Sequence, residues 1–198
     1  MTFIETIPEE QASGALARLY EQQRADDGYV WNNTQAFSHR PEVLAGWNKF
    51  LKTISANMEL RRYELATLAA ARRLRSSYCM LAHGSVLLDN ELLEPDELRA
   101  VATDHRTAGL DAAEVAVMDL AEKVAGDATS ITEDDIDALR AVGLSDPEIL
   151  DVVLAAAARC FMSKTIDALG AQPDREYEDR LDPPLRDALT VGRPIATS

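Results

Sequence analysis

The stretch Ser145-Asp146-Pro147-Glu148, the apolar run that extends to Leu169, and Gly170 after it decide the fold class of this chain. Serine with glutamate three residues later forms a capping box, and proline in the first turn supplies a backbone angle that suits a helix. A glycine directly after the last apolar residue is typical of a helix C-terminus. The pattern predicts one long helix that ends at Gly170, with Pro173 just beyond it.

Seven other segments, all N-terminal to this helix, also carry apolar residues at helical spacing, and residues 31–33 are expected to be a loop. No segment shows sustained alternation of apolar and polar residues, which is the mark of a strand. The sequence therefore predicts an all-α fold of about eight helices, with a single domain over residues 1–180 and a loose C-terminal arm over residues 181–198. The seven segments begin near residues 8, 41, 61, 78, 94, 111 and 132.

Charge excludes several classes of partner. The 198 residues contain 20 basic and 34 acidic side chains, a net charge of −14. Nucleic acid and anionic membrane are repelled by such a field, so neither is expected as the main partner. No apolar run has the length needed to cross a bilayer, and the first five residues lack the basic start and apolar run of a signal peptide. We expect a cytoplasmic protein with reduced thiols.

Residues 76–84 contain the side chains best suited to chemistry. Cys79 and His83 are four residues apart and share one helix face, with Ser76 at the cap on the same side. A thiol in the first turn is favoured as a thiolate by the helix dipole and the free amides, and His83 can accept its proton. The spacing alone leaves a second interpretation open, because a lone cysteine on an apolar helix is usually a core residue. Core is also the expected role of Cys160.

Tyr78, Cys79, Ala82 and His83 resemble the active-site motif of the alkylhydroperoxidase D-like, or carboxymuconolactone decarboxylase, superfamily, and most closely its peroxidase-related branch. The family motif is a glutamate, then about a dozen residues later Cys-x-x-Cys-x-x-x-His, and Glu64 stands at the place of that glutamate. The resemblance continues in residues 28–33, 39–44 and 166–174 and spans most of residues 7–178.

The chain departs from the family motif at one position. Ser76 stands where the family has its first cysteine, and a hydroxyl cannot form a disulfide. The two-cysteine redox cycle of complete members is therefore not available at this motif. The resemblance still implies the AhpD-like helical fold and a homo-oligomer, since members assemble as dimers, trimers or hexamers.

The first functional hypothesis is a thiol-dependent peroxidase-like oxidoreductase with peroxiredoxin-type, antioxidant activity. Cys79 would be oxidised by peroxide to a sulfenic acid, which an external thiol or, less favourably, Cys160 would resolve. Glu64 and His83 would form the proton relay, and Ser76 would orient water or substrate.

Two other hypotheses stay open. In one, Glu64 and His83 perform cofactor-free acid–base chemistry on a small organic acid, as a decarboxylase, lyase or isomerase, and Arg72, Arg73 and Arg75 attract the acid. In the other, the chain is a non-catalytic helical oligomer.

The sequence predicts no metal and no cofactor. Cys79, His83 and Glu64 offer three possible ligands, but no Cys-x-x-Cys or His-x-x-x-His pair supports a zinc site. No glycine-rich phosphate loop follows a strand pattern. His39 and His105 are expected to be structural or surface residues, and Trp31 and Trp47 core or interface anchors. The predicted catalytic residues are Cys79, His83, Glu64, Ser76 and Tyr78.

Overall fold

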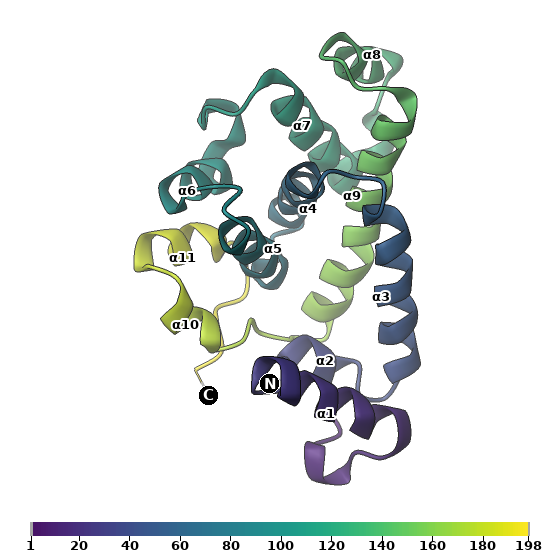
Figure 1. The fold of residues 1–198 in the computed structure, drawn as a ribbon, viewed down its shortest axis with the longest axis vertical. Helices are drawn as coiled ribbons and strands as arrows, with labels where there is room; N and C mark the ends of the chain where they lie inside the picture. Colours follow the sequence, from purple (N-terminus) through teal and green to yellow (C-terminus); the bar gives the residue numbers. More distant parts are fainter. Residues whose placement is uncertain (1, 198) are drawn as a thin grey trace.

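The computed structural model describes residues 2–197, and these residues form α-helices and short 3-10 turns with no strand (Figure 1). The predicted all-α fold is confirmed. The elements are η1 (Glu9–Gln11), α1 (Gly14–Asp27), α2 (Asn32–Ala36), α3 (Pro41–Ser55), α4 (Leu60–Leu74), α5 (Ser77–Asp89), α6 (Pro95–Asp104), η2 (His105–Thr107), α7 (Ala112–Asp127), η3 (Ala128–Ser130), α8 (Glu133–Ala141), α9 (Asp146–Ala168), α10 (Glu176–Arg180) and α11 (Pro183–Leu189).

The described residues contain eleven α-helices, and the eight predicted ones correspond to α1 and α3 to α9. The three missed helices, α2, α10 and α11, have five to seven residues each, too few turns to show a helical period. The expected loop at residues 31–33 is instead the start of α2. The first long helix begins at Gly14, because residues 9–11 form a separate 3-10 turn and Ser13 is extended.

Helix α4 lies at the centre of the fold and packs against α5, α7 and α9 (Figure 1). Its alanines Ala66, Ala69, Ala70 and Ala71 are completely buried. Side chains this small allow neighbouring helices to approach closely, and burial of the larger side chains beside them provides the main stabilisation. The glutamate of the predicted motif, Glu64, is carried into the interior on this helix.

A tight turn joins α4 to α5 and sets the direction of the motif helix. Arg75 adopts a left-handed conformation with φ 58°, and the Ser76 amide donates to the Ala71 carbonyl at 3.0 Å. Gly192 of the C-terminal segment packs on this turn so closely that a Cβ there would lie 1.9 Å from the Arg75 carbonyl oxygen. The Gly192 amide also donates to Ser77 Oγ at 2.7 Å. The C-terminal segment therefore holds the start of α5 in place.

The expectation of a loose arm is wrong for residues 181–197. Helix α11 packs against α6 and α5, with Leu185 and Leu189 almost fully buried. Ile195 and Ala196 are also buried, and the Ala196 amide donates to the Pro173 carbonyl at 2.9 Å. The apolar positions of this segment are too few to show a pattern along the chain, and only their burial reveals their role. No helix within residues 2–197 combines the length and hydropathy needed to cross a membrane.

Candidate functional site

A cavity of about 410 Å³ is lined by residues of α1, α2, α3, α5, α9 and α10. Helix α5 contributes Tyr78, Cys79 and His83 to its lining, and Arg159 comes from α9. A cavity of this size matches the range of small-molecule sites. Three of the five predicted catalytic residues thus line one cavity, and Glu64 lies directly behind it through its contact with His83.

Cys79 lies at the inner end of the cavity and is 2% exposed. Ser163 Oγ donates to Cys79 Sγ at 3.2 Å, and Arg159 Nη1 donates to the same sulfur at 3.6 Å. Both donors come from α9. A hydrogen bond from a cation stabilises negative charge on sulfur more strongly than a neutral donor does. The thiol therefore has a polar environment that a cysteine in an ordinary apolar core lacks.

His83 and Glu64 form a buried pair. His83 Nδ1 lies 2.6 Å from Glu64 Oε2, and the two side chains are 14% and 5% exposed. Burial, together with the Arg159 charge, lowers the pKa of His83, although Glu64 acts in the opposite direction. The imidazole is therefore neutral at pH 7. The neutral ring donates its Nδ1 proton in a hydrogen bond to the Glu64 carboxylate. The Nε2 lone pair is then free to accept a proton.

Arg159 is the main site residue that the sequence analysis missed. It is 4% exposed, and its Nε has no hydrogen-bond partner among the described residues. Burial acts to lower the pKa of the guanidinium, but Cys79, Tyr63 and Glu64 raise it overall, so the charge is retained. One signal was present in the sequence: Arg159 follows four consecutive alanines in the apolar run of α9. A single cation there has to be either exposed or paired inside.

Ser76 and Tyr78 have different positions from those expected. Ser76 is fully buried, makes no side-chain capping bond and does not line the cavity. It lies beside Asp167 of α9: burial raises the pKa of this carboxyl, while the Ser76 hydroxyl lowers it. Tyr78 lines the cavity, but its hydroxyl donates to Asp174 Oδ2 and accepts from the Asn33 amide at 3.2 Å. The Tyr78 hydroxyl is thus placed for structural contacts, whereas Ser76 Oγ has no hydrogen-bond partner among the described residues.

Asp174 provides a stability prediction. Its carboxylate is 2% exposed and accepts from Tyr78 and from the Asn32 amide at 2.7 Å, so it joins three distant segments. Burial raises its pKa to about 6. The folded state then holds a proton that the unfolded chain has lost, and this contribution to stability is present below pH ~4 and lost as the pH rises through about 6.

Asp174→Asn, which carries no charge, avoids that loss. Its free energy of unfolding relative to wild type should rise by on the order of 2–3 kcal/mol between pH 4 and 7. Urea unfolding at both pH values measures this difference. The exposed substitution Asp179→Asn on α10 is the control, and an Asp174→Asn difference that stays constant with pH would contradict the prediction.

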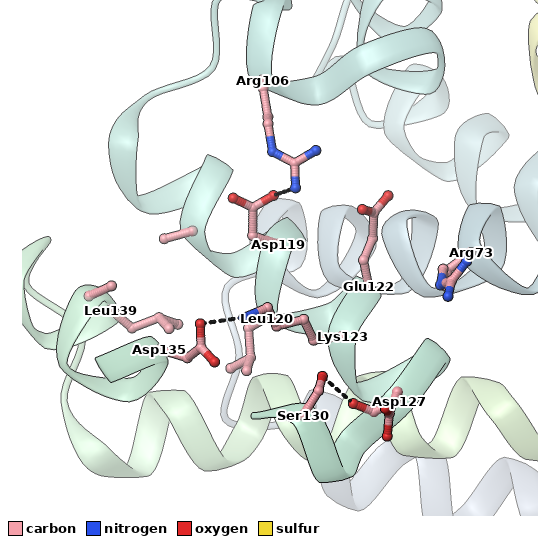
Figure 2. Close-up of a pocket in the computed structure, with 12 residues that line it drawn as sticks. Arg73, Arg106, Asp119, Leu120, Glu122, Lys123, Asp127, Ser130, Asp135 and Leu139 are labelled. Atoms are coloured by element: carbon pink, nitrogen blue, oxygen red, sulfur yellow. Dashed lines mark hydrogen bonds and ion pairs between the residues drawn. The ribbon is translucent and has the colours of Figure 1, made fainter. Parts of the chain in front are cut away.

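A second charged cluster lies away from the cavity, between η2 and α7 (Figure 2). Figure 2 shows Arg106 directed at Asp119, and these side chains are 2.5 Å apart. His105, Asp119 and Glu122 lie close enough to hold a cation. However, His105 bonds Asp119 at 2.7 Å and Arg72 pairs with Glu122 at 2.6 Å. Guanidinium groups already neutralise both carboxylates, so we assign this cluster a structural role.

The arginines expected to attract an acidic substrate lie outside the cavity. Arg72 belongs to the charged cluster, Arg73 lines the separate pocket in Figure 2, and Arg75 donates to the Val191 carbonyl. Conversely, Trp31 and Trp47 both line the cavity and are therefore wall residues of the site rather than only core or interface anchors.

Comparisons with known proteins agree with the sequence motif. Residues 41–123 match the carboxymuconolactone decarboxylase family model, and this segment includes Glu64, Cys79 and His83. The family resemblance is confirmed. No curated protein matches the chain.

Solved structures of several proteins share the fold. The alkylhydroperoxidase AhpD core protein of Ralstonia eutropha JMP134, an uncharacterized peroxidase-related protein, has a TM-score of 0.78 at 20% identity and covers 89% of this chain and 94% of its own. A peroxidase-related protein of Silicibacter sp. TM1040 has a TM-score of 0.72 at 22% identity, with coverages of 88% and 90%. The debrominase Bmp8 has a TM-score of 0.74 at 12% identity, with coverages of 94% and 98%. The AhpD-like fold is thereby confirmed.

Proposed function

We propose that this chain, in which a carboxymuconolactone decarboxylase family segment is set in an AhpD-like fold, is a thiol-dependent peroxidase-like oxidoreductase with Cys79 as its single reactive thiol. The observation that carries the proposal is the pair of donors on the buried Cys79 Sγ, Arg159 and Ser163, beside a cavity that opens to solvent. The names of the peroxidase-related structures support the same chemistry.

The proposed reaction starts with transfer of the thiol proton to His83 Nε2. The thiolate attacks the outer oxygen of a hydroperoxide, so that an S–O bond forms as the O–O bond breaks. The leaving oxygen takes a proton from His83 and departs as an alcohol or water. Sulfur is oxidised to a sulfenic acid, and the peroxide is reduced. The unpaired Arg159 Nε–H is a donor for the leaving oxygen as its charge develops.

Reduction of the sulfenic acid requires thiols from outside this site. Ser76 cannot resolve it, and Cys160 donates to the Ala156 carbonyl at 3.4 Å and does not line the cavity. An external thiol would displace water from the sulfenic acid to form a mixed disulfide. A second external thiol would then release Cys79, with both reductant thiols leaving as their disulfide.

Trapping the sulfenic acid tests the proposal directly. A Cys160→Ser variant would be treated with one equivalent of cumene hydroperoxide and then with dimedone, and Cys79 would be analysed by mass spectrometry. We expect near-complete labelling at Cys79, and no labelling in the Cys79→Ser, Cys160→Ser double variant. An unlabelled Cys79 that remains available for alkylation after peroxide treatment would overturn the proposal.

The His83–Glu64 pair favours a second candidate, acid–base chemistry on a small organic acid, because a neutral buried imidazole held by a carboxylate is a competent base without a thiol. Cys79→Ser distinguishes the two, since it retains acid–base activity but not peroxidase activity. The debrominase that shares this fold was also solved in complex with 2,3,4-tribromopyrrole. Bromopyrroles are therefore a useful counter-screen in the same assays.

A further inference from the structure

The charged side chains of the cavity are distributed between its two ends. Arg159 belongs to the buried part of the lining and is 4% exposed. Arg180 of α10 and Asp89 of α5 line the open end, where their side chains are 41% and 53% exposed. Two arginines and one aspartate thus line a cavity in a chain of net charge −14. The lining side chains carry one more positive than negative charge, Glu64 lies behind His83, and the exposed Arg180 is the cation that the carboxylate of a ligand can reach.

Polar and apolar side chains share the lining of the cavity, and its apolar part includes three aromatic rings. Trp31, Trp47 and Tyr177 provide aromatic surface, and the aliphatic part of the lining comes from α3, α5 and α9. Trp31 and Tyr177 pack on one another with ring centroids 5.9 Å apart. Such walls favour a flat or ring-containing apolar body over a fully polar molecule.

Arg180 already binds a carboxylate at the mouth. Its Nη2 pairs with Asp89 Oδ2, an ion pair exposed to solvent. Asp89 is the last residue of α5, where the helix dipole disfavours a negative charge. This carboxylate is therefore a weak competitor, and it shows the position that an incoming carboxylate can take.

We propose that the substrate is an amphiphilic molecule with an apolar, ring-containing body and a carboxylate at the end opposite its reacting group. Arg180 binds the carboxylate in place of Asp89, while the reacting group lies at Cys79 and Arg159. This inference rests on the proposed function for the identity of the reacting group, a hydroperoxide, but the recognition of the carboxylate is a binding property.

Binding can be measured with the unreactive ligands phenylbutyrate and its neutral amide. Both tryptophans line the cavity, so their fluorescence reports occupancy. We expect the carboxylate to bind about tenfold more tightly than the amide at low salt. In Arg180→Gln, the affinity for the carboxylate should be about equal to that for the amide. Asp89→Asn should tighten carboxylate binding, because it removes the competing group.

Arg186→Gln is the matched control. Arg186 of α11 also forms an ion pair with a carboxylate, that of Glu178, but does not line the cavity. The Arg186→Gln variant should still bind phenylbutyrate about tenfold more tightly than its amide. Circular dichroism checks that each variant is folded, and Asp89→Asn together with the salt dependence of wild-type binding tests the inference independently of Arg180→Gln. Equal affinities for the two ligands, no binding of either, or a ratio unchanged in Arg180→Gln would each overturn the inference.

A reactive pair of substrates separates this inference from the proposed function. Cumene hydroperoxide and its para-carboxylate derivative present the same peroxide with and without a distant carboxylate. Faster sulfenic acid formation at Cys79 with the carboxylate derivative than with cumene hydroperoxide supports both the proposed function and the substrate inference. Carboxylate-selective binding without oxidation by either peroxide would contradict the proposed function alone. Oxidation at equal rates by both peroxides would contradict the substrate inference alone.

Discussion

Replacing His83 with asparagine is expected to slow sulfenic acid formation at Cys79 by about 10²- to 10⁴-fold, the usual contribution of a positioned general acid–base group. Asparagine can still donate a hydrogen bond to Glu64, so the buried carboxylate keeps a partner, but it cannot accept the thiol proton. Stopped-flow mixing with peroxide, followed by dimedone quenching, measures the rate. His39→Asn is the matched control, because His39 is exposed and bonds only the Glu5 carbonyl.

The wild-type rate should also have a characteristic pH profile. Burial lowers the pKa of His83 below its ordinary value of 6.5, so the neutral base persists below that pH. The rate that depends on the neutral base is therefore expected to hold through pH 6.5 and to fall only at lower pH. A wild-type rate that is already halved above pH 6.5, or a His83→Asn rate equal to wild type, would show that this imidazole is not the base.

Replacing Arg159 with methionine is expected to slow the same step by about 10²- to 10³-fold, comparable to the loss of one oxyanion donor. The change removes the cation from Cys79 Sγ and the free donor for the leaving oxygen. The variant should also lose stability, because removal of one member of a buried charged group leaves Glu64 less compensated, so the unfolding temperature is measured alongside the rate. The rate of Cys79 alkylation should fall in parallel.

The pH profile distinguishes this role from a structural one. The Arg159 charge helps to lower the pKa of His83. In Arg159→Met that pKa should therefore rise, and the fall in the oxidation rate on the acidic side of the pH profile, its acidic limb, should move to higher pH. The surface substitution Arg99→Met on α6 is the control and should leave both the rate and the limb unchanged. A rate loss in Arg159→Met that accompanies a large fall in unfolding temperature, with no movement of the limb, would assign Arg159 a packing role only.

Local sequence patterns were sufficient for the long helices. Capping boxes at Asp111 and Ser145, proline at the first turn, and apolar residues at helical spacing act within one or two turns, so their effects can be predicted without tertiary contacts. Helices α2, α10 and α11 could not be predicted in this way. They are short and are stabilised by what they pack against, as the burial of Tyr177, Leu185 and Leu189 shows.

The candidate site also has one part that local sequence patterns predict and another that depends on tertiary packing. The Cys79–His83 spacing on one helix follows from the sequence, and the family resemblance adds the register of Glu64 on the preceding helix. Which groups surround the sulfur depends on tertiary packing. Arg159 and Ser163 are 80 and 84 residues beyond Cys79, and no local pattern links them to it.

The tertiary structure also decided the roles of Ser76 and Tyr78. Both belong to the motif in sequence, but successive side chains on a helix point in different directions, so neighbours of Cys79 in the chain need not be its neighbours in space. Ser76 faces Asp167, and the Tyr78 hydroxyl bonds Asp174. Helix periodicity is local and can be deduced from the chain, whereas the cavity arises where six helices meet, and their mutual packing depends on the whole core.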